Sequence, residues 1–220
     1  MSASTAFRFL STKQFARVGR FVLLLFAFPI LAVAQPELVD IRAIDPTIVV
    51  ELRYAGSRNA ARRPLYPTQM PALVRPSVAE RLLAAQSYLQ IRGYGLKIWD
   101  AYRPKAAHDV LWQISRNSDY VEDPAKGTGS LHTWGVAVDA TLVDDRGRDV
   151  AMPTDFDDFT PSAMLRYNGN NAKVRYHLRI LQSAMARAGF YGLRTEWWHF
   201  IAPDWEKYRA VSDTQISSLR

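Results

Sequence analysis

The stretch Ser130-Leu-His-Thr-Trp-Gly-Val-Ala-Val-Asp139 decides how the rest of this chain is interpreted. It places an imidazole, His132, in a loop just before a predicted strand, and a carboxylate, Asp139, on that strand. Gly135 lies between them and allows the tight bend that would bring the two side chains together. A His–Asp hydrogen bond without a metal explains this pair equally well, so the pair alone leaves both interpretations open.

A second stretch, Glu196-Trp-Trp-His199, adds another imidazole and another carboxylate. Together with it, His132, Asp139 and His199 make a three-ligand zinc site with an open fourth position. Glu196 is then a candidate general base, because a dry wall of Trp raises a carboxyl pKa. A regular strand would turn Glu196 and His199 to opposite sides, so a turn or bulge is expected there. The alternative is that Glu196 is an ordinary surface carboxylate.

The combined pattern predicts a zinc hydrolase. One of the two Trp side chains is expected in the core and the other on the wall of a pocket. Arg103, at the end of a predicted strand, is placed to stabilise a developing oxyanion. Its alternative role is a salt bridge to Asp100. The other two histidines, His108 and His177, lie in predicted helices and are left out of the site, His177 with a solvent-facing or capping role.

The N-terminus has the pattern of a secretory signal peptide. Basic residues up to Arg20 precede the apolar run 21–34, which ends in Ala32-Val-Ala34 before Gln35. The sequence therefore predicts a leader at 1–34 and one catalytic domain at 35–220, with no stable membrane insertion after cleavage. An uncleaved membrane anchor is the alternative, disfavoured because the run is well short of ~20 residues.

Charge and cysteine content narrow the possible partners. The chain carries 28 Lys and Arg against 21 Asp and Glu, a formal charge of +7. Without residues 1–34 this becomes 24 against 21, or +3, with no dense basic run, so a nucleic-acid partner is not expected. The absence of Cys from the sequence excludes a thiolate metal site and a Cys nucleophile. An exported protein without disulfides fits a bacterial periplasm. The sequence carries no signal of oligomeric state.

The predicted elements favour an α+β fold with a central, mostly antiparallel sheet and flanking helices. Strands are expected at 38–54 with a turn at 45–46, at 70–74, 95–101 and 136–143, at 148–152 as a hairpin return, and at 190–202. Helices are expected at 77–93, 104–117 and 172–189, the first opened by a capping box of Ser77 and Glu80. Residues 118–129 are expected to form a surface loop.

Three motifs resemble those of the D-alanyl-D-alanine dipeptidases over about residues 38–202. This family belongs to a wider group of zinc proteins that includes D,D-carboxypeptidases and the hedgehog-like domain, so a D,D-peptidase-like zinc peptidase fold is implied. The motif Ser-x-His-x-x-Gly-x-Ala-x-Asp is met by Ser130, His132, Gly135, Ala137 and Asp139. The motif Asp-x-Tyr-Arg-Pro is met by Asp100, Tyr102, Arg103 and Pro104. The motif Glu-x-Trp-His is met by Glu196, Trp198 and His199.

The resemblance implies a role for each residue of the predicted centre. His132, Asp139 and His199 would hold one Zn²⁺ per chain. Glu196 would take a proton from the attacking water and pass it to the leaving amine, and Arg103 would stabilise the tetrahedral transition state.

Three further residues are implied as substrate contacts. Tyr54 matches the family's early Tyr-Ala motif, and Asp157 matches its Phe-Asp motif and would bind the substrate ammonium. Ser130 would contact substrate in the same pocket. Two motifs depart from the family: its Asn-Phe-x-Gly is Asn59-Ala-Ala-Arg here, and its Met-Gly-Thr/Ser is Met152-Pro-Thr154. These departures bear on dipeptide preference and leave the metal chemistry intact.

The expected function is hydrolysis of the small D-alanyl-D-alanine dipeptide by a periplasmic zinc enzyme, in wall-peptide turnover or recovery of D-alanine. One alternative is a D,D- or L,D-carboxypeptidase acting on the stem peptides of the wall. A more distant alternative is a non-catalytic, zinc-bearing wall-binding module, which would have no need of Glu196 and Arg103.

Overall fold

The computed structural model describes residues 37–212, and a five-stranded sheet lies at their centre. In spatial order the strands are β2 (Val49–Val50), β4 (Tyr94–Asp100), β5 (Ala137–Asp144), β7 (Glu196–Ile201) and β6 (Tyr191–Leu193). β2 pairs with β4 in parallel, and every other neighbouring pair is antiparallel. The predicted α+β class with a mostly antiparallel sheet is confirmed.

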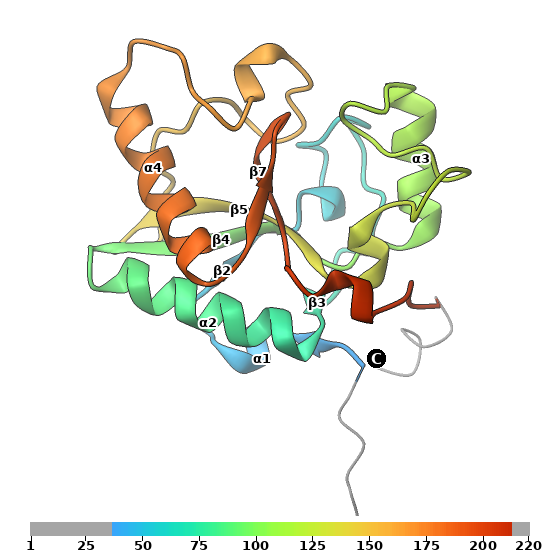
Figure 1. Ribbon diagram of the computed structural model, residues 1–220, viewed down its shortest axis with the longest axis horizontal. Coiled ribbons are helices and arrows are strands. Elements are labelled where there is room, and N and C mark those ends of the chain that lie inside the picture. Colours follow the sequence, from blue (N-terminus) through green and yellow to red (C-terminus); the bar gives the residue numbers. More distant parts are fainter. Residues whose placement is uncertain (1–36, 213–220) are drawn as a thin grey trace, which may run out of the picture. The chain divides into compact units, whose positions relative to one another are not determined.

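Two long helices, α2 (Pro76–Gln90) and α4 (Ala172–Arg187), pack against each other and against the central strands (Figure 1). Their apolar residues recur every three or four positions, so each helix buries one stripe on the sheet. The buried stripes are Val78, Leu82, Ala85 and Leu89 in α2, and Val174, Leu178, Leu181 and Met185 in α4. Helix α3 (Lys105–Ser115) lies apart from this pair, at the right of Figure 1.

The remaining elements are short. β1 (Val39–Asp40) pairs with β3 (Leu73–Val74) in a separate two-stranded antiparallel sheet. The short elements are β1 (Val39–Asp40), α1 (Ile41–Ile44), β3 (Leu73–Val74) and the 3₁₀ turns η1 (Arg53–Ala55), η2 (Leu131–Trp134), η3 (Pro161–Ala163) and η4 (Trp205–Lys207).

Aromatic side chains form the part of the core that lies behind the candidate site. Trp197 is fully buried, and its ring lies 5.5 Å from both Trp99 and Trp198, centroid to centroid. Phe156 extends this cluster, with its ring 5.9 Å from that of Trp198. Trp198 also lines the cavity that holds the predicted site residues. The expectation of one Trp in the core and one on a pocket wall is confirmed.

The prediction of strand over 38–54, with a turn at 45–46, was wrong for most of its length. Only Val39–Asp40 and Val49–Val50 are strands, and Arg53–Ala55 is a 3₁₀ turn. Residues Ile41–Ile44 form a single helical turn, because the Asp40 side chain accepts a hydrogen bond from the backbone N–H of Arg42. The Asp45 backbone N–H donates a hydrogen bond to the Ile41 carbonyl, which completes the turn. Local capping therefore overrides the β-branched composition on which the strand prediction rested.

Two other local predictions were also wrong. Helix α2 begins at Pro76 with Arg75 as its N-cap, and the Ser77 hydroxyl shares a hydrogen bond with the Tyr208 hydroxyl at 2.8 Å instead of capping the helix. Pro lacks a backbone N–H, which the first helical position does not need, and the helix therefore starts two residues earlier than a cap at Ser77 predicts. The expected strand at 148–152 is reduced to an isolated bridge between Val143 and Asp149.

The predicted leader, residues 1–34, lies outside the described residues. Among residues 37–212, no helix combines the length and the apolar character needed to cross a bilayer.

Candidate active site

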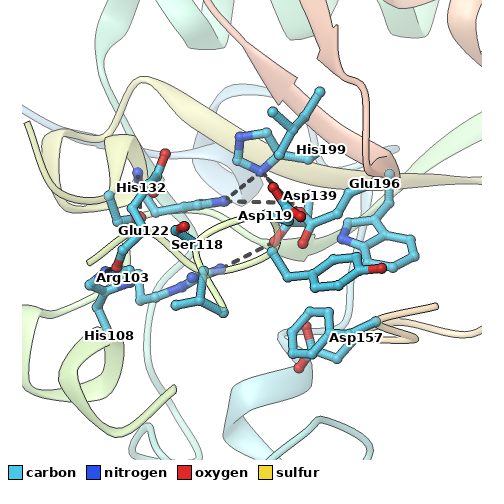
Figure 2. A pocket seen from close by; sticks show the side chains of 16 residues that line it. Arg103, His108, Ser118, Asp119, Glu122, His132, Asp139, Asp157, Glu196 and His199 are labelled. Carbon is cyan, nitrogen blue, oxygen red and sulfur yellow. Dashed lines mark hydrogen bonds and ion pairs between the residues drawn. The ribbon is translucent and has the colours of Figure 1, made fainter. Parts of the chain in front are cut away.

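Two adjacent strands and one 3₁₀ turn bring the predicted metal ligands together. Asp139 on β5 and His199 on β7 are direct partners in the antiparallel ladder, so their side chains leave the same face side by side. His132 comes from η2, whose first turn is capped by the Ser130 side chain. Gly135 ends this turn with a φ of 71°, a backbone conformation that favours glycine. Figure 2 shows the three side chains converging.

The three donor atoms have the spacing of a metal site. His199 Nδ1 lies 2.9 Å from Asp139 Oδ1 and 3.1 Å from His132 Nε2, and His132 Nε2 lies 3.4 Å from Asp139 Oδ1. Tetrahedral ligands at the usual zinc distances are roughly 3.3 Å apart, so the donor set fits such an ion. The three residues form a group that could hold a metal ion.

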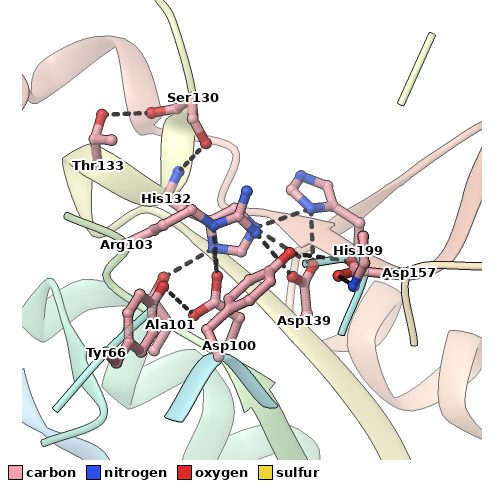
Figure 3. A network of polar contacts seen from close by, with 12 residues as sticks. Tyr66, Asp100, Ala101, Arg103, Ser130, His132, Thr133, Asp139, Asp157 and His199 are labelled. Carbon is pink, nitrogen blue, oxygen red and sulfur yellow. Dashed lines mark hydrogen bonds and ion pairs between the residues drawn. The ribbon is translucent and has the colours of Figure 1, made fainter. Parts of the chain in front are cut away.

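Groups behind His132 fix which ring nitrogen faces the site. Its Nδ1 lies 2.8 Å from the Ala101 carbonyl, which only accepts, so Nδ1 carries the proton and Nε2 is free to donate its lone pair. Asp100, fully buried, lies 3.5 Å from the same Nδ1. Its carboxylate also accepts hydrogen bonds from the Tyr66 hydroxyl and from Arg103 Nε, each at 2.8 Å (Figure 3).

Charge within the centre favours an ionised Asp139. Burial alone would raise its pKa, but the opposing charges and hydrogen bonds of His132 and His199 hold the pKa below its usual value. An ionised carboxylate is the form that binds a cation, so the local electrostatics agree with the metal geometry.

Glu196 reaches the same cavity because β7 is irregular at its start. The register between β6 and β7 shifts between Gly192 and Leu193, where the ladder jumps to Glu196. This irregularity is the bulge that the sequence required, and it leaves a Glu196 carboxylate oxygen 3.9 Å from His199 Nδ1. Glu196 is buried rather than on the surface. Burial, then the negative charges of Asp139 and Asp157, raise the pKa of Glu196 well above its ordinary value.

Arg103 forms the salt bridge to Asp100 that was considered for it, and it also lines the cavity. Its Nε donates to Asp100, while one terminal nitrogen points to Asp139 Oδ2 at 3.4 Å. Its guanidinium carbon also lies 4.9 Å from the centre of the Tyr54 ring. These contacts hold a buried cation at the edge of the cavity that the ligand residues line.

Asp157 and Tyr54 form a second polar group at this cavity. The Tyr54 hydroxyl donates to Asp157 Oδ1 at 3.0 Å, and the Ala60 backbone N–H donates to Oδ2 at 2.9 Å. Asp157 itself lines the cavity. Its φ of 56° is in the left-handed region, which aspartate adopts more readily than most residues other than glycine. Burial raises the pKa of Asp157 to about 7.

This raised pKa predicts a pH-dependent stability. Protonated Asp157 contributes stability that is fully present below the carboxyl's unfolded pKa and is lost as the pH rises through about 7. We therefore expect Asp157→Asn to stabilise the metal-free protein at about pH 8 but not at about pH 4. Between these values, the difference in unfolding free energy between variant and wild type should grow by at most ~1.4 kcal/mol per pH unit. Thermal melts of both proteins across this range test it; parallel melting curves at every pH would contradict it.

Of the eight predicted site residues, all but Tyr54 line one cavity, and Tyr54 contacts it through Asp157. The predicted surface loop contributes residues that the sequence analysis missed, in the range 118–122. Its Asp119 carbonyl accepts from the Thr195 hydroxyl at 2.8 Å, beside Glu196. Nothing in the composition of this polar segment distinguishes it from an ordinary loop.

Two histidines were also misjudged. His108 is buried and lines the cavity, and its Nε2 lies 2.9 Å from the Glu122 carbonyl, so it ties α3 to the loop. Burial lowers the pKa of His108 to about 4, which keeps it neutral. His177 is buried too, with Nδ1 2.8 Å from the Ala151 carbonyl, rather than facing solvent. Helical position alone does not reveal such hydrogen bonds.

Comparison with known proteins agrees with this geometry. The D-alanyl-D-alanine dipeptidase of Escherichia coli (strain K12) is 33% identical over 177 residues, which cover 80% of this chain and 90% of that protein. The D-alanyl-D-alanine dipeptidase of Enterococcus faecium is 31% identical over 172 residues, 70% of this chain and 85% of that protein. A model of the D-ala-D-ala dipeptidase family matches residues 34–217. The chain belongs to the D-ala-D-ala dipeptidase family.

Proposed function

We propose that the protein hydrolyses the dipeptide D-alanyl-D-alanine to two molecules of D-alanine, with one zinc ion per chain. The observation that carries the proposal is the open donor set of His132, Asp139 and His199 with the buried carboxylate of Glu196 beside it. Family membership and the names of the similar proteins support the substrate.

Zinc is the metal that this donor set suits best. Two imidazole nitrogens and one carboxylate oxygen are typical ligands of catalytic zinc, which keeps a further position open for water or substrate. Softer metals prefer thiolates, and Mg²⁺ and Ca²⁺ prefer all-oxygen sites. When bound, the ion supplies Lewis acidity to the attacking water and the scissile carbonyl.

The protein's own groups then move the proton and stabilise charge. The Glu196 carboxylate takes a proton from the attacking water and returns it to the nitrogen of the leaving D-alanine, which balances the hydrolysis. The guanidinium of Arg103, already oriented by Asp100, stabilises the negative charge that develops on the carbonyl oxygen. The aromatic wall of Trp198 limits water access to these groups.

The remaining cavity residues bind the dipeptide. The Asp157 carboxylate, held by Tyr54, supplies the negative charge that binds the substrate ammonium. Binding of that cation would in turn lower the pKa of Asp157 and keep it ionised. Ser130 contacts the substrate near His132. A carboxylate reserved for a free amino end is what separates a dipeptidase from an enzyme that trims longer peptides.

Substitution of Arg103 should separate transition-state stabilisation from fold stability. We expect Arg103→Lys to lower kcat by about 10²–10³-fold, as for loss of one oxyanion donor, with a smaller change in KM. Lys keeps a positive charge beside Asp100 and Asp139, so no buried carboxylate is left without a cation. Steady-state kinetics together with a thermal melt measure both quantities. A variant with unchanged kcat would remove Arg103 from the chemical step.

The leader pattern supports export, and we propose that the enzyme works in the periplasm, in wall-peptide turnover or recovery of D-alanine. Fractionation of cells that express the full chain tests this location. Recovery of the mature protein with an N-terminus at Gln35 is expected, and a full-length cytoplasmic protein would contradict it.

A substrate panel distinguishes this proposal from the carboxypeptidase alternative. The purified protein is incubated with D-Ala-D-Ala and with a pentapeptide that ends in D-Ala-D-Ala, and D-alanine release is measured. Release from the dipeptide alone is expected, because Asp157 requires a free ammonium next to the scissile residue. Release from the pentapeptide would reassign the activity to a carboxypeptidase. A folded, zinc-loaded protein that cleaves neither would favour the wall-binding module.

A further inference from the structure

Two segments far apart in the sequence build the proposed ammonium site, and their relative position must be fixed. Tyr54 lies on η1, and Asp157 lies in the loop that follows the β5 strand. The segment after η1 also supplies the Ala60 N–H that binds the second oxygen of Asp157. A small displacement between the segments would therefore move the carboxylate that meets the substrate.

Asp155, two residues before Asp157, contacts both segments. Its Oδ1 accepts a hydrogen bond from the backbone N–H of Phe156 at 2.9 Å, which fixes the chain just before the left-handed φ of Asp157. Its Oδ2 accepts from a terminal nitrogen of Arg58 at 3.0 Å, and a terminal nitrogen of Arg53 lies 3.7 Å from Oδ1. One carboxylate thus holds its own loop in shape and ties it to the η1 segment.

Arg53, one of the two arginines that contact Asp155, is itself held in place by neighbouring side chains. Its side chain is only 2% exposed, its guanidinium carbon lies 4.9 Å from the centre of the Trp99 ring, and its Nε lies 3.3 Å from a Glu51 carboxylate oxygen. Asp155 and Arg58 are more exposed, at 56% and 60%. Exposed ion pairs add little to stability, so the pair of Asp155 and Arg58 acts mainly by fixing the position of the loop.

We propose that Asp155 is a positioning residue for substrate binding: through Arg58, Arg53 and the Phe156 N–H, it holds Asp157 where the dipeptide ammonium binds. Asp155 acts only through Asp157 and has no direct part in the chemistry. The inference rests on the proposed function, because it assigns Asp157 to the ammonium of a dipeptide.

Kinetics of Asp155→Ala and Arg58→Ala test the inference. Misplacement of a binding group by 1 Å can cost about 100-fold, and we expect the smaller shift here to raise KM for D-Ala-D-Ala by about tenfold for Asp155→Ala, with kcat within about twofold. Arg58→Ala should show the same pattern more weakly, since the Phe156 contact remains. Asp145→Ala, which removes an exposed carboxylate from the turn after β5, is the matched control and should match wild type.

An analogue that lacks the ammonium distinguishes misplacement of Asp157 from a general distortion of the site, which would weaken the binding of dipeptide and analogue alike. Propionyl-D-alanine has the dipeptide's shape without the amino group, so its inhibition constant should be the same for wild type and Asp155→Ala. The double variant Asp155→Ala with Asp157→Asn should have the KM of Asp157→Asn alone, because the two residues act in series. Asp155→Asn, which retains an acceptor for the Phe156 N–H, replaces Asp155→Ala if that variant does not fold.

The outcomes separate the two claims. If wild type cleaves D-Ala-D-Ala and KM is unchanged in the Asp155 variants, or if the effects of Asp155 and Asp157 simply add, the positioning role is overturned while the proposed function stands. If wild type itself releases no D-alanine, the proposed function fails and this inference fails with it.

Discussion

Replacement of Glu196 by Gln is expected to lower kcat for D-Ala-D-Ala by about 10³-fold, within the range that general acid–base groups contribute. Gln keeps the size of the side chain but cannot accept a proton, so substrate and metal should bind as before. Burial, and then the charges of Asp139 and Asp157, raise the pKa of Glu196, and carboxyls perturbed in this way are typical of acid–base groups in active sites. Steady-state kinetics and metal analysis of the same preparation measure both effects.

Stability provides the control for this variant. A buried carboxyl with a raised pKa destabilises the folded protein when it ionises, so Glu196→Gln should melt no lower than wild type at neutral pH. A variant that melts normally, binds metal and has lost activity has lost the base alone. A Glu196→Gln protein that keeps full activity would show that another group accepts the proton.

Replacement of His199 by Ala should have the second large effect, loss of the metal. The variant keeps only two of the three metal ligands. Substitution of residues that merely support a ligand weakens metal binding by about 10–100-fold, so we expect loss of a ligand to lower the metal affinity by at least ~100-fold and to abolish activity. His199 is the most exposed of the three ligand residues, which makes its removal the least disruptive to the core. Competition with a chromogenic chelator measures the affinity.

Thermal stability shows the same loss independently of activity. Metal at about 100 times its dissociation constant stabilises the folded protein by about 2.7 kcal/mol, so wild type should melt higher when metal is added. His199→Ala should show no such shift at the same concentration. An equal shift in the two proteins would place the metal elsewhere and contradict the ligand set.

The candidate metal ligands could be predicted from the sequence because they lie in two short motifs, and the structure brings their donor atoms together. His132 and Asp139 lie seven positions apart on either side of a glycine, and Glu196 lies three before His199. The structure adds that Asp139 and His199 are ladder partners and that a shift in register turns Glu196 toward them. Strand pairing depends on tertiary structure, so the sequence could require the bulge without locating it.

The parts that the sequence did not predict depend on contacts between distant residues or on local capping. His108 joins the cavity wall through the Glu122 carbonyl, a hydrogen bond that no periodicity reveals. The Ser77 hydroxyl meets Tyr208, 131 positions away, and so does not cap its helix. The helical turn at Ile41–Ile44 results from a single Asp40 hydrogen bond within a stretch of strand-like composition.

The most direct test of the account is D-alanine release from D-Ala-D-Ala by the purified protein, measured before metal removal, after it, and after zinc is added back. The account predicts release that stops when the metal is removed and returns fully with one zinc ion per chain. Release that continues at the same rate in protein shown to be free of metal would contradict it, as would a folded, zinc-loaded protein that releases none.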